Sequence, residues 1–157
     1  MKVLIATEGS KFSQAAIDKF CNMFDESENT EIRIISAVEP AYAPPESFNV
    51  SAEYTRELDA ASRKHANEVI SQASEEIRRR VPSLANNLTT KVVTGPPERA
   101  IVKEAEDWKA DVIFVGSHGY AFWKKALLGS VSSSVVHHAP CSVVIVRTPK
   151  TSNSKNS

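Results

Sequence analysis

The stretch DVIFVGSHGYAFWKKALLGSVSSSVVHHAP, residues 111–140, indicates the architecture of the protein most directly. Its first residues are almost continuously apolar, which is typical of a strand covered on both faces within a parallel sheet. The glycines Gly116, Gly119 and Gly129 follow, and a run of small hydroxyl residues then opens a helical pattern. The stretch therefore predicts a buried strand, a loop with much bare backbone, and a helix.

The alternation of strand and helix extends over most of the chain. Strand-like runs occupy residues 2–7, 31–38, 89–94, 111–116 and 142–147. Helical patterns with apolar stripes separate them, and the longest helix is expected to bury a stripe that includes Leu58 and Val69. It follows residues 39–54, a Pro-rich stretch that we interpret as an irregular loop. This order predicts a three-layer, doubly wound α/β domain with a five-stranded parallel sheet.

The composition fits one domain, at residues 1–147, followed by a tail at residues 148–157 that is expected to be disordered. Lysine plus arginine and aspartate plus glutamate number 19 each, so no net charge favours nucleic acid or an anionic membrane as a partner. The N-terminal apolar run is too short for a signal peptide, and no run approaches the length of a membrane helix. We therefore expect a cytoplasmic protein.

The cysteine and histidine residues give no strong indication of a metal site. Cys21 and Cys141 form no C-x-x-C motif, and we interpret both as small buried apolar side chains, with a redox switch as the alternative. His137 and His138 are adjacent and point in different directions on a helix, whereas a helical metal site prefers same-face spacing. They are interpreted as helix-end residues, and the arginines at 78–80 as a solvated helix end.

The glycine-rich loop lies where a doubly wound fold binds its ligand. Such folds bind ligands beyond the carboxyl ends of the strands, where the strand order reverses. If the first and fourth strands are neighbours, the loops at residues 6–10 and 116–119 converge there. Ser130 can cap the following helix, whose N–H groups and dipole make an anion site. A phosphate site and a tight connection without a ligand both remain open, because the spacing fits neither a P-loop nor a Rossmann motif.

Gly116-x2-Gly119-x9-Gly129-Ser130 resembles the ATP-binding signature of the universal stress protein family. The resemblance extends from residue 2 to about residue 147 and implies the strand order 3-2-1-4-5 of the adenine nucleotide alpha hydrolase-like fold. Four segments carry it besides the glycines: VLIATEGS, TGPPERAIVKEA, DVIFVGSHG and LLGSVSSSVVHHAPCSVVIVR.

The resemblance also implies a site for ATP or another adenine nucleotide, with Mg²⁺ or Mn²⁺ held through the phosphates. Glu8 stands where the family usually has Asp, which adds one methylene to the carboxylate arm. Lys124 and Lys125 either reach the phosphates or are solvated. The implied site residues are Ala6, Thr7 and Glu8 at the adenosine end, Val38 with its backbone on adenine, Gly116, His118 and Gly119 along the ribose and phosphates, and Gly129, Ser130, Val131 and Ser132 around the phosphates.

Several functional classes are compatible with this site. The sequence has no G-x-S-x-G nucleophile elbow. A receiver domain needs clustered acids after the first strand and a lysine after the fifth, but ATEGS supplies one acid and IVRTP supplies no matching lysine. We expect an ATP-binding, nucleotide-dependent regulatory module in a stress response, and not an efficient enzyme. A nucleotide-free interaction protein and a slow ATPase are the alternatives. The last strand, at residues 142–147, is expected to pair with its twin in a homodimer, because an open apolar sheet edge is a liability.

Overall fold

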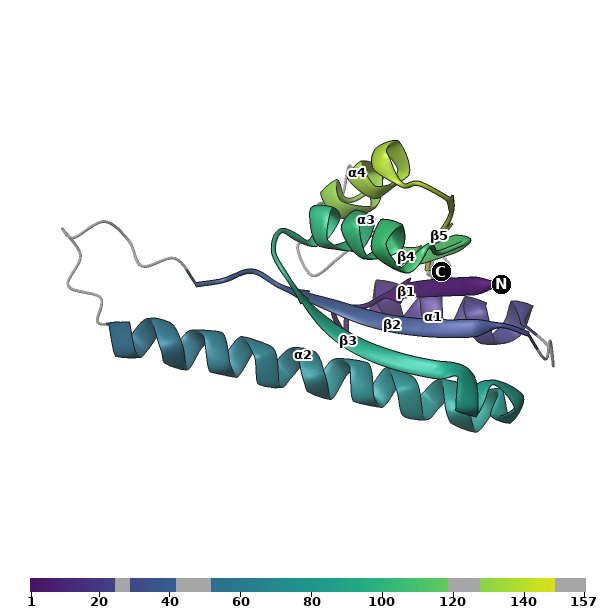
Figure 1. Ribbon diagram of the computed structural model, residues 1–157, viewed down its shortest axis with the longest axis horizontal. Helices are drawn as coiled ribbons and strands as arrows, with labels where there is room; N and C mark the ends of the chain where they lie inside the picture. Colours follow the sequence, from purple (N-terminus) through teal and green to yellow (C-terminus); the bar gives the residue numbers. More distant parts are fainter. Residues whose placement is uncertain (25–28, 42–51, 119–127, 149–157) are drawn as a thin grey trace, which may run out of the picture.

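The computed structural model describes residues 1–24, 29–41, 52–118 and 128–148 (Figure 1). Their regular elements alternate between strand and helix along the chain, as the sequence predicts. The elements are β1 (Lys2–Ala6), α1 (Lys11–Met23), β2 (Glu31–Val38), α2 (Ala52–Arg80), the 3-10 helix η1 (Pro82–Asn87), β3 (Leu88–Thr94), α3 (Pro97–Trp108), β4 (Val112–Gly116), α4 (Ser130–His138) and β5 (Ser142–Val146).

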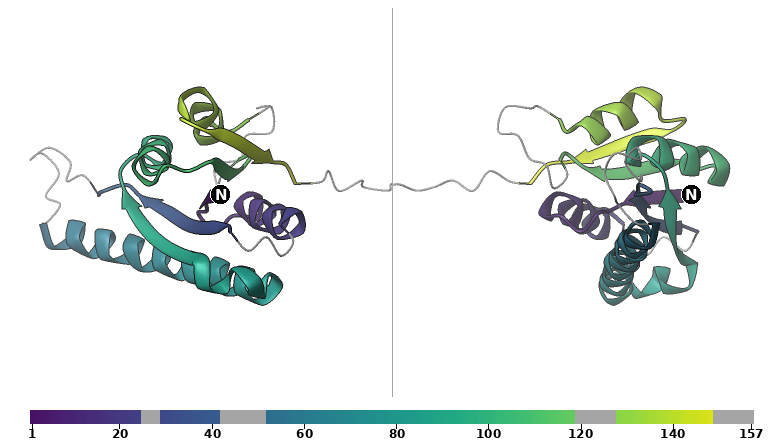
Figure 2. Two further views of the ribbon diagram at one scale, coloured as in Figure 1. Left: turned by 45° about the vertical axis from the view of Figure 1, so that its right-hand side comes forward. Right: turned by 90° about the vertical axis from the view of Figure 1, so that its left-hand side faces the viewer.

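The strands form one parallel sheet in the order β3-β2-β1-β4-β5, which confirms the predicted fold class and strand order. Helices α1 and α2 cover one face of the sheet, and α3 and α4 cover the other (Figure 2). Neighbouring residues of a strand serve opposite faces: Ile34 packs on the α1–α2 side and Ile35 on the α3–α4 side. This double coverage explains the almost continuous apolar runs in the sequence.

The order of the strands reverses at β1, which lies between β2 and β4. Ala6 is the last residue of β1 and lies opposite Ile35 of β2. A tight turn then leads into α1: Gly9 adopts a positive φ of 84°, and Ser10 caps the helix by accepting a hydrogen bond from the N–H of Ser13. The carboxyl ends of β1 and β4 therefore lie side by side, as the predicted site requires.

Helix α2 differs from its prediction at both ends. It begins at Ala52, inside the stretch predicted as a loop, and its first turns carry exposed residues. Leu58 is 42% exposed and does not belong to the buried stripe, which starts at Ala66. At the other end, Arg80 is not simply solvated: it pairs with Asp18 at 2.5 Å and thereby ties α2 to α1. The helix extends well past the strands it covers (Figure 1).

Both cysteines are half-buried free thiols. Burial raises the pKa of Cys21 and of Cys141, which lowers the thiolate fraction at neutral pH. This change opposes the reactivity that a redox switch requires. The helices of the described residues include none that is both long and apolar enough to span a membrane. The predicted tail lies outside the described residues, apart from its first residue.

Candidate functional site

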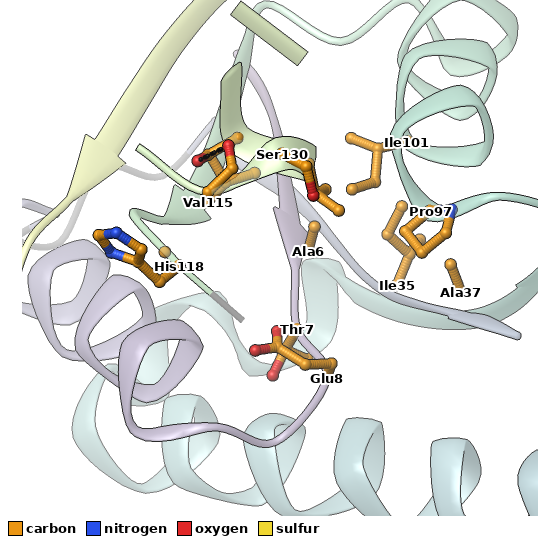
Figure 3. A pocket seen from close by; sticks show the side chains of 14 residues that line it. Ala6, Thr7, Glu8, Ile35, Ala37, Pro97, Ile101, Val115, His118 and Ser130 are labelled. Carbon is orange, nitrogen blue, oxygen red and sulfur yellow. Dashed lines mark hydrogen bonds between the residues drawn. The ribbon is translucent and has the colours of Figure 1, made fainter. Parts of the chain in front are cut away.

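A pocket of about 270 Å³ opens at the carboxyl ends of β1 and β4, on the α3–α4 side of the sheet (Figure 3). This volume lies just below the roughly 300–1,000 Å³ that is usual for small-molecule sites. All of the predicted site residues except Val38 and Gly119 line it. Gly119 lies outside the described residues, as do Lys124 and Lys125.

The structure brings Ala37, and not Val38, to the pocket. The carbonyl of Val38 accepts the N–H of Gly95 and so faces β3, whereas the carbonyl of Ile35 accepts the N–H of Thr7 on the β1 side. Because peptide groups alternate along a strand, those of Ala37 face the β1 side, beyond the last β1 residue. The peptide groups of Ala37 are therefore the β2 backbone groups that face the site beyond the end of β1.

One end of the pocket is apolar. Ile35 and Ala37 reach it from β2, while Pro97 and Ile101 reach it from the start of α3. Figure 3 shows these side chains gathered together, away from Thr7, Glu8 and His118. Sequence reasoning missed all four, together with Val115. The parity of β2 and the spacing of Pro97 and Ile101 by one helical turn are the signals that indicate them.

Another part of the pocket lining is the first turn of α4. Gly129 is the N-cap residue and makes no side-chain cap, so Ser130 is not the cap that the sequence predicts but the first helical residue. The N–H of Gly129 is already used, because it donates to the carbonyl of Ser117 at 2.8 Å. Within the part of the chain that the structure describes, the N–H groups of Ser130, Val131 and Ser132 have no backbone acceptor, so they can donate to a ligand.

Gly116 owes its lack of a side chain to packing. It has the same parity as Phe114, which faces α1. A β-carbon at position 116 would lie 2.5 Å from the carbonyl carbon of Phe12 and 2.8 Å from the nitrogen of Ser13. Gly129 is also tightly placed, with a built β-carbon 3.2 Å from the α-carbon of His118. The bare backbone thus has a structural cause besides any ligand.

The polar side chains beside β1 are engaged with one another. The hydroxyl of Thr7 donates to Ser13 Oγ at 3.1 Å and accepts the N–H of Gly9 at 3.2 Å. Glu8 accepts a hydrogen bond from the hydroxyl of Ser10 through Oε1. The ring of His118 packs against Phe12 of α1, with the ring centres 5.2 Å apart. The ring therefore lies toward α1 and lines only the edge of the pocket. Among the described lining residues, Glu8 is the only aspartate, glutamate, lysine or arginine.

A protein-built metal centre does not appear in the described part of the chain. Within residues 1–24, 29–41, 52–118 and 128–148, histidine, cysteine, aspartate and glutamate form no group of three that could hold an ion. His137 and His138 instead bond to the carbonyls of Ser133 and Ser134, one turn earlier in α4.

Comparison with known proteins connects this architecture with one family. The sequence model of the universal stress protein family matches residues 1–147. A universal stress protein of Methanocaldococcus jannaschii is 29% identical over 153 residues, which cover 95% of this chain and 83% of that protein.

Solved structures show the same fold. The universal stress protein UspA from Lactobacillus plantarum matches with a TM-score of 0.79 at 24% identity, covering 94% of this chain and 97% of that one. A universal stress protein in complex with cAMP matches with a TM-score of 0.63 at 26% identity, covering 95% of this chain and 98% of that one.

Proposed function

Because the chain belongs to the universal stress protein family, we propose that it binds an adenine nucleotide in this pocket and acts as a nucleotide-dependent regulatory module. The observation that carries the proposal is the mixed lining of the pocket, with apolar side chains from β2 and α3 and backbone N–H groups from the first turn of α4. A nucleotide is divided in the same way, into a flat base and phosphates. The cAMP complex of a relative supports adenine as the base. A cytoplasmic location and a role in stress stay predictions from the sequence.

The apolar end would hold the base. Ile35, Pro97 and Ile101 would cover the ring, and the peptide groups of Ala37 would meet its polar edge. Adenine presents one acceptor and one donor on that edge, while guanine presents them in the opposite order. A buried, unpaired peptide group costs free energy, so the backbone of Ala37 would favour adenine over guanine.

The first turn of α4 would hold the phosphates. The N–H groups of Ser130, Val131 and Ser132, with the positive end of the helix dipole, suit an anion. Ser130 is exposed, and its hydroxyl makes no hydrogen bond within the described residues. Mg²⁺ or Mn²⁺ would be held mainly by phosphate oxygens and water, since both ions bind oxygen and keep several waters. Contacts from Lys124 and Lys125 remain a prediction from the sequence.

We infer a binding module and not an efficient enzyme from the chemistry of this lining. Glu8 is the only carboxylate among the described lining residues, and its neighbours lie at the β1 end. Backbone donors would bind the ground state and the transition state about equally, which gives affinity without rate. We expect ATP hydrolysis well below about 1 s⁻¹. Phosphate release at or above that rate, lost on a pocket substitution, would favour the ATPase alternative.

Two measurements test nucleotide binding. Acid extraction of the purified protein should release an adenine nucleotide, and calorimetry should show binding of ATP and AMP but much weaker binding of GTP. Ala37→Phe would fill the apolar end and should abolish the signal. Ala61→Phe makes the same change on an exposed turn of α2 and should have no effect. No heat with millimolar ATP and Mg²⁺ would favour the nucleotide-free interaction protein.

We also propose a homodimer through β5. The sheet has edges at β3 and β5. Strand β3 carries Lys91, a charge that discourages edge pairing, whereas β5 has no charged residue and leaves Val143, Val144 and Ile145 only partly covered. Pairing two copies of β5 about a two-fold axis would cover this edge.

A further inference from the structure

The carbonyl oxygen of Ser117 receives two hydrogen bonds from the start of α4. The N–H of Gly129 donates to it at 2.8 Å, and the hydroxyl of Ser132 donates at 2.9 Å. The same hydroxyl lies 3.1 Å from the carbonyl oxygen of Gly129. Ser117 is 2% exposed and Ser132 is 3% exposed, so these bonds are shielded from water. The segment that leaves β4 and the segment that opens α4 are thus joined at one buried peptide group.

The hydroxyl of Ser132 cannot at the same time serve a phosphate as a donor. A serine hydroxyl has one hydrogen, and here that hydrogen is shared between the carbonyls of Ser117 and Gly129. Phosphate oxygens at neutral pH mainly accept hydrogen bonds. The side chain of Ser132 therefore has a different task from that of Ser130, although both belong to the same turn.

We propose that Ser132 is a positioning residue that holds the first turn of α4 at a fixed place relative to the exit of β4. This inference rests on the proposed function, because it assigns to Ser132 the alignment of the N–H groups that would bind phosphate. The backbone of Ser117 is itself anchored, since its N–H donates to the carbonyl of Val146 in β5 at 2.8 Å. Through Ser132, the first turn of a short helix is fastened to the sheet.

Pre-aligned donors bind an anion more tightly than donors that must first be ordered. The adenosine part of a nucleotide would contact Ala37 and the apolar end, and the hydrogen bonds of Ser132 go to Ser117 and Gly129 instead. Loss of the hydroxyl should therefore weaken the binding of AMP and leave the affinity for adenosine unchanged. One net hydrogen bond corresponds to a roughly three- to tenfold change in the dissociation constant.

The test compares Ser132→Ala, Ser132→Thr and Ser133→Ala by calorimetry with AMP and with adenosine. Thr keeps the hydroxyl and should restore AMP binding. Ser133 is the adjacent serine of the same helix, and its hydroxyl makes no hydrogen bond within the described residues, so it is the matched control. Hydrogen exchange of the Gly129 amide is measured in each protein and should be faster in Ser132→Ala alone.

The outcomes separate this inference from the proposed function. Unchanged AMP affinity in Ser132→Ala would overturn the positioning role of Ser132. An equal loss of affinity for AMP and for adenosine would also overturn it, because that result would indicate damage to the whole pocket. A wild-type protein that binds neither ligand would refute the proposed function instead. Exchange of the Gly129 amide would then still test whether Ser132 holds the turn, and unchanged protection in Ser132→Ala would overturn the inference.

Discussion

Gly116→Ala is expected to destabilise the folded protein in the absence of any nucleotide. The new methyl carbon would lie 2.5 Å from the carbonyl carbon of Phe12, 2.6 Å from its oxygen and 2.8 Å from the nitrogen of Ser13. Carbon atoms pack best at about 3.5–4.0 Å, so the overlap is about 1 Å. These neighbours belong to the backbone of α1 and cannot rotate away. Helix α1 or the end of β4 must move.

Overpacking of this kind costs about 1–3 kcal/mol. For a chain of this size, each kcal/mol lowers the melting temperature by roughly 2–4 °C, which gives a loss of about 2–12 °C. Circular dichroism during heating measures the fall in melting temperature, and urea titration measures the loss of unfolding free energy, both on nucleotide-free protein. Gly129→Ala is the graded comparison, because its contacts at 3.2 and 3.3 Å require a smaller shift and should cost about 1 kcal/mol. An alanine variant at position 116 that melts with the wild type would refute the packing explanation.

Three further substitutions or reactions test other parts of the structure. Ser130→Ala should leave the free energy of unfolding within about 0.5 kcal/mol of the wild type, because Ser130 is exposed and is not the helix cap, but calorimetry should show weaker AMP binding. Val144→Lys should give monomers in sedimentation experiments, and a wild-type protein that sediments as a monomer at micromolar concentration would contradict the proposed dimer. Cys21 and Cys141 should be alkylated more slowly at pH 7 than free cysteine, because burial raises the pKa of both thiols and lowers the thiolate fraction. Mass spectrometry measures the alkylation rates, and a rate faster than that of free cysteine at either residue would contradict the expectation.

The fold was predictable from the sequence because a parallel sheet covered on both faces requires strands that are almost continuously apolar. The apolar runs around Ile5, Phe114 and Ile145 have no polar alternation, and helical stripes separate them. The N-terminal turns of α2 were not predictable in the same way. Their apolar residue Leu58 continues the spacing of a stripe, but the sheet that would cover it has already ended.

The site was predictable as a location but not in its atomic assignments. The choice between Ala37 and Val38 depends on which side of β2 each peptide group faces, and this follows from the pairing with β1 and β3. The sequence likewise shows that Gly116 has no side chain but not which neighbour requires this. The hydroxyls of Ser130 and Ser132 look equivalent in the sequence, and only the position of the Ser117 carbonyl separates them.

The close contact between Gly116 and α1 bears on how this domain can diverge. If the chain binds nucleotide as proposed, a descendant that lost this binding would still be held to glycine at position 116 by the backbone of Phe12, and less strictly at position 129. Ala37 and Ser130 would be released from any such constraint and could drift. Glycine at position 116, and to a lesser degree at position 129, would therefore persist after nucleotide binding was lost. Sequence searches that rely on glycine at positions 116 and 129 would collect binding and non-binding descendants together, and the residues at positions 37 and 130 would be the ones that separate them.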